Sequence, residues 1–153
     1  MPETVLGLPL HPLVVHAVVV LVPLSALGAV AVALVPRWLS PYSLLVALGA
    51  LGCAVTAFVA REAGDNLADN LQLGGPVLEQ VELHGRYGLW TLLSSIPFAI
   101  LAVATYVLQR QRGPDSVTRV VAALAAMAGL VVTGAAVLAG HSGSTAVWNP
   151  GSL

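Results

Sequence analysis

The sequence predicts an all-α fold, an integral-membrane four-helix bundle, from its composition and from the spacing of its apolar residues. Hydrophobic residues make up 58% of the 153 residues, while charged residues make up only 8%, against about 25% in soluble domains. The apolar residues gather in four stretches of about 20 residues each, the length with which a helix crosses a bilayer core of about 30 Å. These observations exclude a water-soluble globule and predict a single transmembrane domain over residues 1–153.

The first two predicted helices cover residues 13–35 and 41–71. Pro12 suits the first turn of the first helix, where proline is tolerated, and Pro36 ends that helix. The second helix begins at Ser40-Pro41, a cap followed by proline, and its polar final part keeps helical spacing. It is therefore expected to continue beyond the bilayer.

The last two predicted helices cover residues 76–110 and 116–140. The third helix follows a turn at Gly74-Gly75 and also begins outside the bilayer, so that a helical hairpin projects from the membrane between the second and third helices. Asp115 caps the fourth helix, and Gly140 is expected to close it.

The arginines predict the orientation of the bundle. The two turns that join the first helix to the second and the third to the fourth carry Arg37, Arg110, Arg112 and Arg119, while the opposite side carries Arg61 and Arg86. Basic residues accumulate on the cytoplasmic side of membrane proteins. Both termini and the projecting hairpin are therefore expected to be extracytoplasmic.

Several functions are made unfavourable by the sequence. The six basic residues are scattered, so no nucleic-acid surface is expected. The four apolar stretches contain no Asp, Glu, Lys or Arg, which argues against a proton pump or ion transporter. No nucleophile-base pair is visible, so we do not expect an enzyme by itself. The expected partners are the lipid bilayer and a larger membrane complex or a redox partner.

Four histidines are the main indication of chemistry, because all of them fall at the ends of the apolar stretches that face one side: His11, His16, His84 and His141. Two imidazoles from different helices can hold the iron of a b-type haem. His16 and His84 are the first candidates for such a ligand pair. Space for a porphyrin would come from Gly85, Gly88, Gly134 and Gly140.

Two other interpretations of the histidines stay open. The same four side chains could hold copper or zinc, with the nearby carboxylates of Glu62, Asp65 and Asp69 as ligands or supporting groups. Alternatively no cofactor binds, and the histidines are polar residues at a membrane interface that satisfy helix ends.

Helices one and three also share a histidine 12 or 13 residues before a proline, at Pro23 and Pro97. A duplicated two-helix unit would explain this echo, although proline is common in membrane helices.

The opening motif resembles a known family. The run His11-Pro12-x-x-Val15-His16, the histidine that opens the third helix and the closing segment 140–143 together resemble a widespread bacterial family of four-helix membrane proteins catalogued as a domain of unknown function (DUF2231-like). In that family the motif is usually followed by Phe-Pro, whereas Ala17 follows here.

The resemblance covers essentially the whole chain and implies a multi-pass protein of the bacterial cytoplasmic (inner) membrane. Some relatives are joined to a Rieske-type iron-sulfur domain, which favours a redox role. We therefore expect a redox-associated subunit that binds b-type haem, or another metal, through histidines at the outer interface. The alternative is a cofactor-free accessory or scaffolding subunit of a larger membrane complex.

Overall fold

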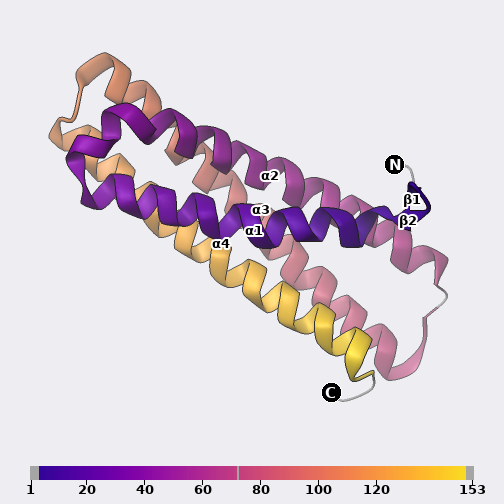
Figure 1. The fold of residues 1–153 in the computed structure, drawn as a ribbon. Coiled ribbons are helices and arrows are strands. Elements are labelled where there is room, and N and C mark those ends of the chain that lie inside the picture. The colour runs from indigo at the N-terminus through magenta and orange to yellow at the C-terminus, as the bar shows by residue number, and fades with distance from the viewer. Residues whose placement is uncertain (1–3, 72, 151–153) are drawn as a thin grey trace.

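Four long helices form one bundle in a computed structural model, which describes residues 4–71 and 73–150 (Figure 1). They are α1 Leu10–Leu34, α2 Leu39–Asn70, α3 Gly75–Arg112 and α4 Ser116–Trp148. Both α1 and α3 pack against α2 and α4, so α1 and α3 are diagonally opposite. The predicted all-α four-helix architecture is confirmed.

All four helices are long and apolar enough to cross a membrane. The longest, α3, has 38 residues, which corresponds to about 57 Å at 1.5 Å per residue. This length exceeds the roughly 30 Å of a bilayer core. Together, α2 and α3 form the helical hairpin that the sequence predicted around its Gly74-Gly75 turn.

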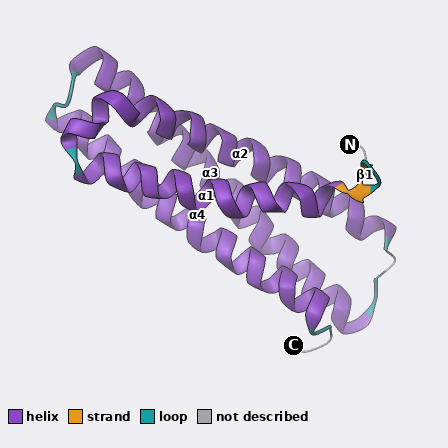
Figure 2. Ribbon diagram, in the orientation of Figure 1, coloured by secondary structure: helices purple, strands orange, loops and turns teal. Residues whose placement is uncertain are grey.

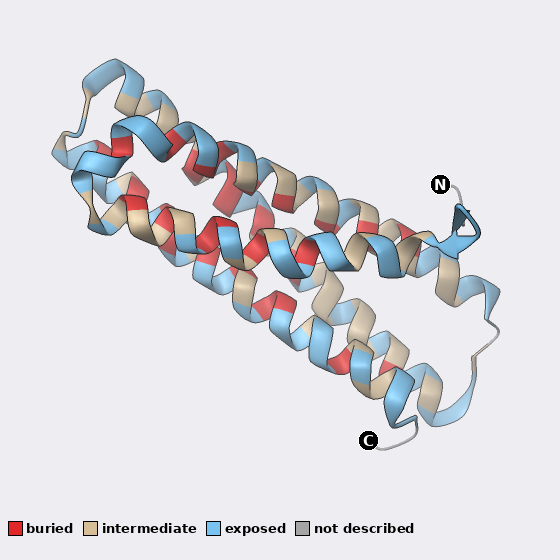
Figure 3. Cartoon of the chain, in the orientation of Figure 1, coloured by how far each residue is buried: buried red, intermediate tan, exposed pale blue. Residues whose placement is uncertain are grey.

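The buried positions of the helices lie on the inner side of the bundle (Figure 3). Most of these positions hold small residues, and large apolar residues are exposed on the surface. Ala26 and Gly129 lie at one of the closest approaches, where a Cβ on Gly129 would be 3.1 Å from the Cα of Ala26 and from Cε2 of Phe98. Such small residues let membrane helices approach closely. The outward-facing leucines and valines suit contact with lipid.

Two helix ends differ from the predicted ones. The first turn of α1 begins at Leu10, so that His11 is helical, and α4 continues past Gly140 to Trp148. Polar side chains support this extension, because the hydroxyls of Ser144 and Thr145 both donate to the carbonyl of His141. Its packing against α3 also favours helix over a glycine stop.

Short elements complete the chain (Figure 2). A two-residue strand β1 (Thr4–Val5) pairs with β2 (Leu8–Pro9) in an antiparallel hairpin that the sequence analysis did not predict. Its turn has Leu6 and Gly7 at positive φ, the conformation of a type I′ turn. A 3₁₀ turn, η1 (Pro36–Trp38), joins α1 to α2.

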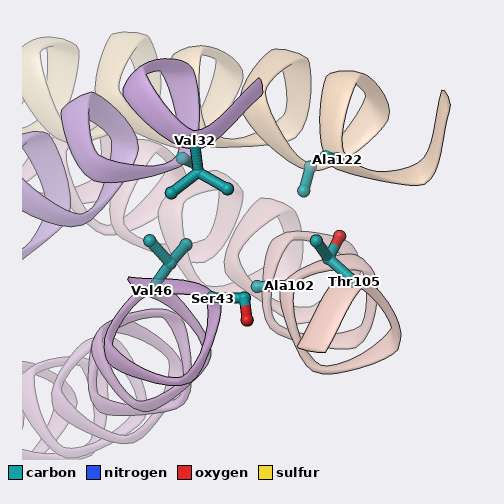
Figure 4. Close-up of a pocket in the computed structure, with 8 residues that line it drawn as sticks. Val32, Ser43, Val46, Ala102, Thr105 and Ala122 are labelled. Carbon is teal, nitrogen blue, oxygen red and sulfur yellow. The ribbon is translucent and has the colours of Figure 1, made fainter. Parts of the chain in front are cut away.

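The end of the bundle that contains η1 is tightly packed. A gap of about 10 Å³ remains between the four helices there, with Val32 and Val46 on one side and Thr105 and Ala122 on the other (Figure 4). A water molecule needs a comparable volume. Nothing larger fits in this gap, and the candidate chemistry lies at the opposite end.

Candidate functional site

His11 and His84 meet at the end of the bundle that carries both termini. Their ring centroids are 5.8 Å apart, and the ring planes are inclined at 87°. His11 is in the first turn of α1 and His84 lies in the third turn of α3. The two half-buried imidazoles therefore connect diagonally opposite helices. Toward this end, α1 and α2 diverge from α3 and α4 (Figure 1).

The ring of His11 is held by α2. Its Nδ1 lies 2.8 Å from the carbonyl oxygen of Ala60. One turn later, Gly64 leaves room for the ring, since a Cβ at that position would be 2.9 Å from both Cε1 and Nδ1 of His11. The carbonyl fixes one ring nitrogen and the glycine forms a surface on which the ring rests.

The ring of His84 is held by α4 in the same way. Its Nδ1 lies 2.9 Å from the carbonyl oxygen of Ala139, and a Cβ on Gly143 would be 2.9 Å from its Cε1. Ser142 adds a longer contact, with its Oγ 3.4 Å from Nδ1 of His84. Each histidine therefore rests on a carbonyl and on a glycine four residues further along the neighbouring helix.

These contacts determine which ring nitrogen carries the proton. A backbone carbonyl only accepts, so Nδ1 donates in both His11 and His84, and Nε2 of each neutral ring keeps its lone pair. No hydrogen bond reaches either Nε2 within residues 4–71 and 73–150. Histidines that bind metals almost always have this arrangement, with the second nitrogen donating to a carbonyl or carboxylate.

His16 and His141 are exposed and lie outside this contact. The Nδ1 of His16 is 2.6 Å from the carbonyl of Pro12 in its own helix. His141 is within α4 rather than after it. The ring that contacts His84 is that of His11, and the structure leaves the predicted ligand roles of all four histidines untested.

The surroundings of the histidine pair limit which metals it could hold. Among the described residues, no three His, Cys, Asp or Glu side chains are grouped so as to hold a metal ion. A cavity of about 140 Å³ adjoins His11, bounded by Leu10, Ala63, Asn66 and Leu67 among others. The four glycines expected to make space, Gly85, Gly88, Gly134 and Gly140, would each accept a Cβ without a neighbour within 4 Å.

Arg61 connects α2 to α3 beside the histidines. Its Nη1 donates to the carbonyl of Gly85 at 3.0 Å, and its Nη2 lies 3.3 Å from Oδ2 of Asp65. Arg61 follows Ala60, which holds His11, and Gly85 follows His84. This hydrogen bond therefore joins the segment of α2 that holds the His11 ring to the segment of α3 that carries His84.

A comparison with known protein families covers almost the whole chain. The family model described as a predicted membrane protein, DUF2231, matches residues 7–152. The chain belongs to the DUF2231 family. No curated protein and no solved structure matches it. The family assignment and the four apolar helices together identify a membrane protein, as the sequence predicted.

The groups that hold the histidines in this DUF2231 chain were not predicted from the sequence. Ala60 and Gly64 form a small-x-x-x-small pattern, as do Ala139 and Gly143. Such patterns mark close helix contacts in membranes, so a signal was present. It does not reveal that the contacting group is an imidazole, because that depends on the packing of separate helices.

Proposed function

We propose that this membrane protein is a redox-associated subunit that binds one b-type haem through His11 and His84. The observation that carries the proposal is the shared arrangement of the two rings. Each Nδ1 donates to a carbonyl of the neighbouring helix, and among the residues that the structure describes no hydrogen bond occupies either Nε2, so both are available as ligand atoms. Cofactor sites in helix bundles are built in this manner, from side chains on facing helices.

The separation of the rings supports a shared iron atom. A metal lies about 2.0–2.1 Å from a coordinating imidazole nitrogen, so two rings on opposite sides of one metal ion have centroids roughly 6 Å apart. The observed separation of 5.8 Å is close to that value.

The number of ligands favours haem over zinc. Zinc sites use three or four protein ligands, and the described residues offer no such group. Haem needs only two from the protein, because the porphyrin supplies the rest. His11 and His84 would be the two residues that hold the haem. The chemistry that such a centre supplies is one-electron transfer.

Haem binding would require the α1–α2 pair of helices to move relative to the α3–α4 pair. The cavity beside His11 measures about 140 Å³, whereas sites for ligands of drug or cofactor size occupy roughly 300–1,000 Å³. The residues that line this cavity come from β1, β2, α1 and α2, so room for a porphyrin would have to come from further separation of α1 and α2 from α3 and α4 at their already divergent end.

The test is an absorption spectrum of the detergent-purified protein, produced with haem supplied and recorded oxidised and then reduced with dithionite. The proposal predicts a reducible Soret band and about one iron per chain. His11→Ala and His84→Ala should each abolish the band, and added imidazole should restore part of it. Because they are exposed and lie outside the pair, His16→Ala and His141→Ala are matched controls that should retain full haem.

Other outcomes overturn the proposal in identifiable ways. Stoichiometric copper with a flat haem region would assign the pair to a copper ion. Loss of haem in His16→Ala, with retention in His11→Ala, would move the ligand role to His16. A colourless, metal-free protein would exclude the cofactor and favour an accessory or scaffolding subunit.

A further inference from the structure

The His11–Ala60 and His84–Ala139 contacts have the same arrangement. The differences in residue number between corresponding residues define two offsets. His84 follows His11 by 73 positions (84 minus 11), and Ala139 follows Ala60 by 79 positions (139 minus 60). The second offset also relates Gly64 to Gly143. One histidine, one carbonyl and one glycine of the α1–α2 hairpin therefore each have a counterpart in the α3–α4 hairpin.

The first offset, of 73 positions, relates the buried residues of α1 to those of α3. Six residues of α1 are buried: Val18, Val22, Ser25, Ala26, Ala29 and Val32. Adding 73 to each number gives the six buried residues of α3 from Thr91 to Thr105. Because this offset was fixed by the histidines and not by burial, the agreement is an independent observation.

The second offset does the same for α2 and α4. Of the nine buried residues of α2, eight have a buried counterpart in α4 at 79 positions further on. The ninth pair is Ala60 and half-buried Ala139, the two carbonyl acceptors. The offsets differ by six positions because α3 runs five residues beyond the counterpart of Leu34 and α4 begins two residues before the counterpart of Leu39, while the loop between α3 and α4 is one residue shorter than that between α1 and α2.

We infer that the chain consists of two copies of one helical hairpin, in which Gly64 and Gly143 are equivalent positioning residues for two equivalent imidazoles. The copies run in the same direction, as in membrane proteins whose parallel repeats are related by an axis along the membrane normal. That axis passes between His11 and His84. The two histidines proposed to bind haem are then held in the same way, one in each hairpin. This inference rests on the proposed function.

The same offsets separate the histidine pair from the other two histidines. The counterpart of His16 is Leu89, and the counterpart of His141 is Glu62. Only His11 and His84 are matched by histidine. The repeat therefore assigns the shared site to this pair and leaves His16 and His141 outside it.

The role of the two glycines follows from the distances. A methyl group on Gly64 would contact the His11 ring at 2.9 Å, and one on Gly143 would contact the His84 ring at 2.9 Å. Each contact is closer than a Cβ tolerates, and each ring is the movable partner. An alanine would therefore push the ring off its carbonyl without touching the iron.

The experiment compares Gly64→Ala and Gly143→Ala with Gly52→Ala. The control crowds a leucine rather than a histidine, because its Cβ would be 3.0 Å from Cδ2 of Leu21. Haem affinity should fall about 10- to 100-fold in both test variants, the range seen when groups supporting a metal ligand are changed. The two losses should be similar, and the control should bind haem as the unmodified protein does.

A second measurement uses haem-free protein with ¹⁵N-labelled histidine. The Nδ1 resonance of His11 should move in Gly64→Ala and that of His84 in Gly143→Ala, with neither moving in Gly52→Ala. If neither glycine variant shifts the Nδ1 resonance of the histidine that the glycine contacts, or if only one of the two variants does, the equivalent positioning roles are rejected. A wild-type protein that binds no haem would reject the proposed function, while the resonances would still decide the roles of the glycines.

Discussion

The imidazole of His11 lies at 87° to that of His84, with the ring centroids 5.8 Å apart. This contact joins α1 to α3 across the diagonal of the bundle. Together with the Arg61–Gly85 hydrogen bond, it provides polar contact between α1–α2 and α3–α4. A metal between the rings would use the two Nε2 atoms, which no hydrogen bond from residues 4–71 and 73–150 reaches.

Arg61 is expected to keep the two histidine segments in register. Arg61→Ala removes the hydrogen bond to Gly85 and the ion pair with Asp65. A hydrogen bond from a charged donor contributes about 1.5–3 kcal/mol, and partial exposure reduces this contribution to roughly 1 kcal/mol. We expect a loss of that size in the free energy of unfolding, measured by SDS titration in mixed micelles, together with weaker haem binding.

Arg86→Ala provides the control for that variant. Arg86 is exposed, and it makes no hydrogen bond or ion pair within the described parts of the chain. Its replacement should change neither quantity. Equal losses in the two variants would show that net charge, rather than the Arg61–Gly85 hydrogen bond, is responsible.

Phe98 is expected to be the most sensitive position of the core. Its side chain is fully buried and packs where α1, α3 and α4 approach around Gly129. Phe98→Ala should lower the free energy of unfolding by about 3–5 kcal/mol, the typical cost of removing a buried ring. The comparison is Ile100→Ala, two residues away and 63% exposed, for which lipid or detergent fills the space. Similar costs would contradict the packing described here.

The N-cap of α4 predicts an acid-dependent contribution to stability. Hydrogen bonds from the backbone N–H and the hydroxyl of Thr118 to Oδ1, with a smaller effect from Arg112, lower the pKa of Asp115. A lowered pKa in the folded state stabilises the fold above the unfolded pKa of about 3.9. This contribution is lost as the pH falls through the folded value.

Thermal unfolding at a series of pH values tests the cap. Wild type should be more stable than Asp115→Asn at pH 7, and the difference in midpoint should shrink below about pH 4, near the pKa of an unperturbed aspartate. Asparagine also caps helices, so the variant should fold. A difference that stays constant down to pH 2.5 would show that the charge on Asp115 is unimportant.

The helices could be predicted from sequence because their signals are local. Twenty-residue apolar stretches, Pro36 and the Asp115 cap determine where the helices run without reference to the rest of the fold. The extension of α4 past Gly140 was missed because it depends on contacts with another helix, including that of Gly143 with the His84 ring.

The histidine site was predictable only in part. His11 and His16 are five residues apart, about 140° around a helix, so only one of them can face the interior. Which one does so depends on the start of α1 at Leu10 and on the hydrogen bond to Ala60. Neither is visible in a single sequence. The location of the histidines at one end of the bundle followed from the topology alone.

The orientation predicted from the arginines can be tested with single cysteines. Gly74 is exposed in the turn between α2 and α3, and Pro114 is exposed in the loop before α4. Cys53, the one native cysteine, is fully buried, so it should give little background. If the loops rich in arginine are cytoplasmic, a membrane-impermeant maleimide should label Gly74→Cys in intact cells.

Pro114→Cys should be labelled only after the cells are permeabilised, because its loop then faces the cytoplasm. The reverse result would place the histidine pair on the cytoplasmic side and would change the class of redox partner that can reach it. Labelling of both positions in intact cells would indicate a mixed orientation, as expected if four arginines against two are too weak a bias. If the proposed haem is present, the side on which His11 and His84 lie would determine whether a cytoplasmic or an extracytoplasmic redox partner can reach it.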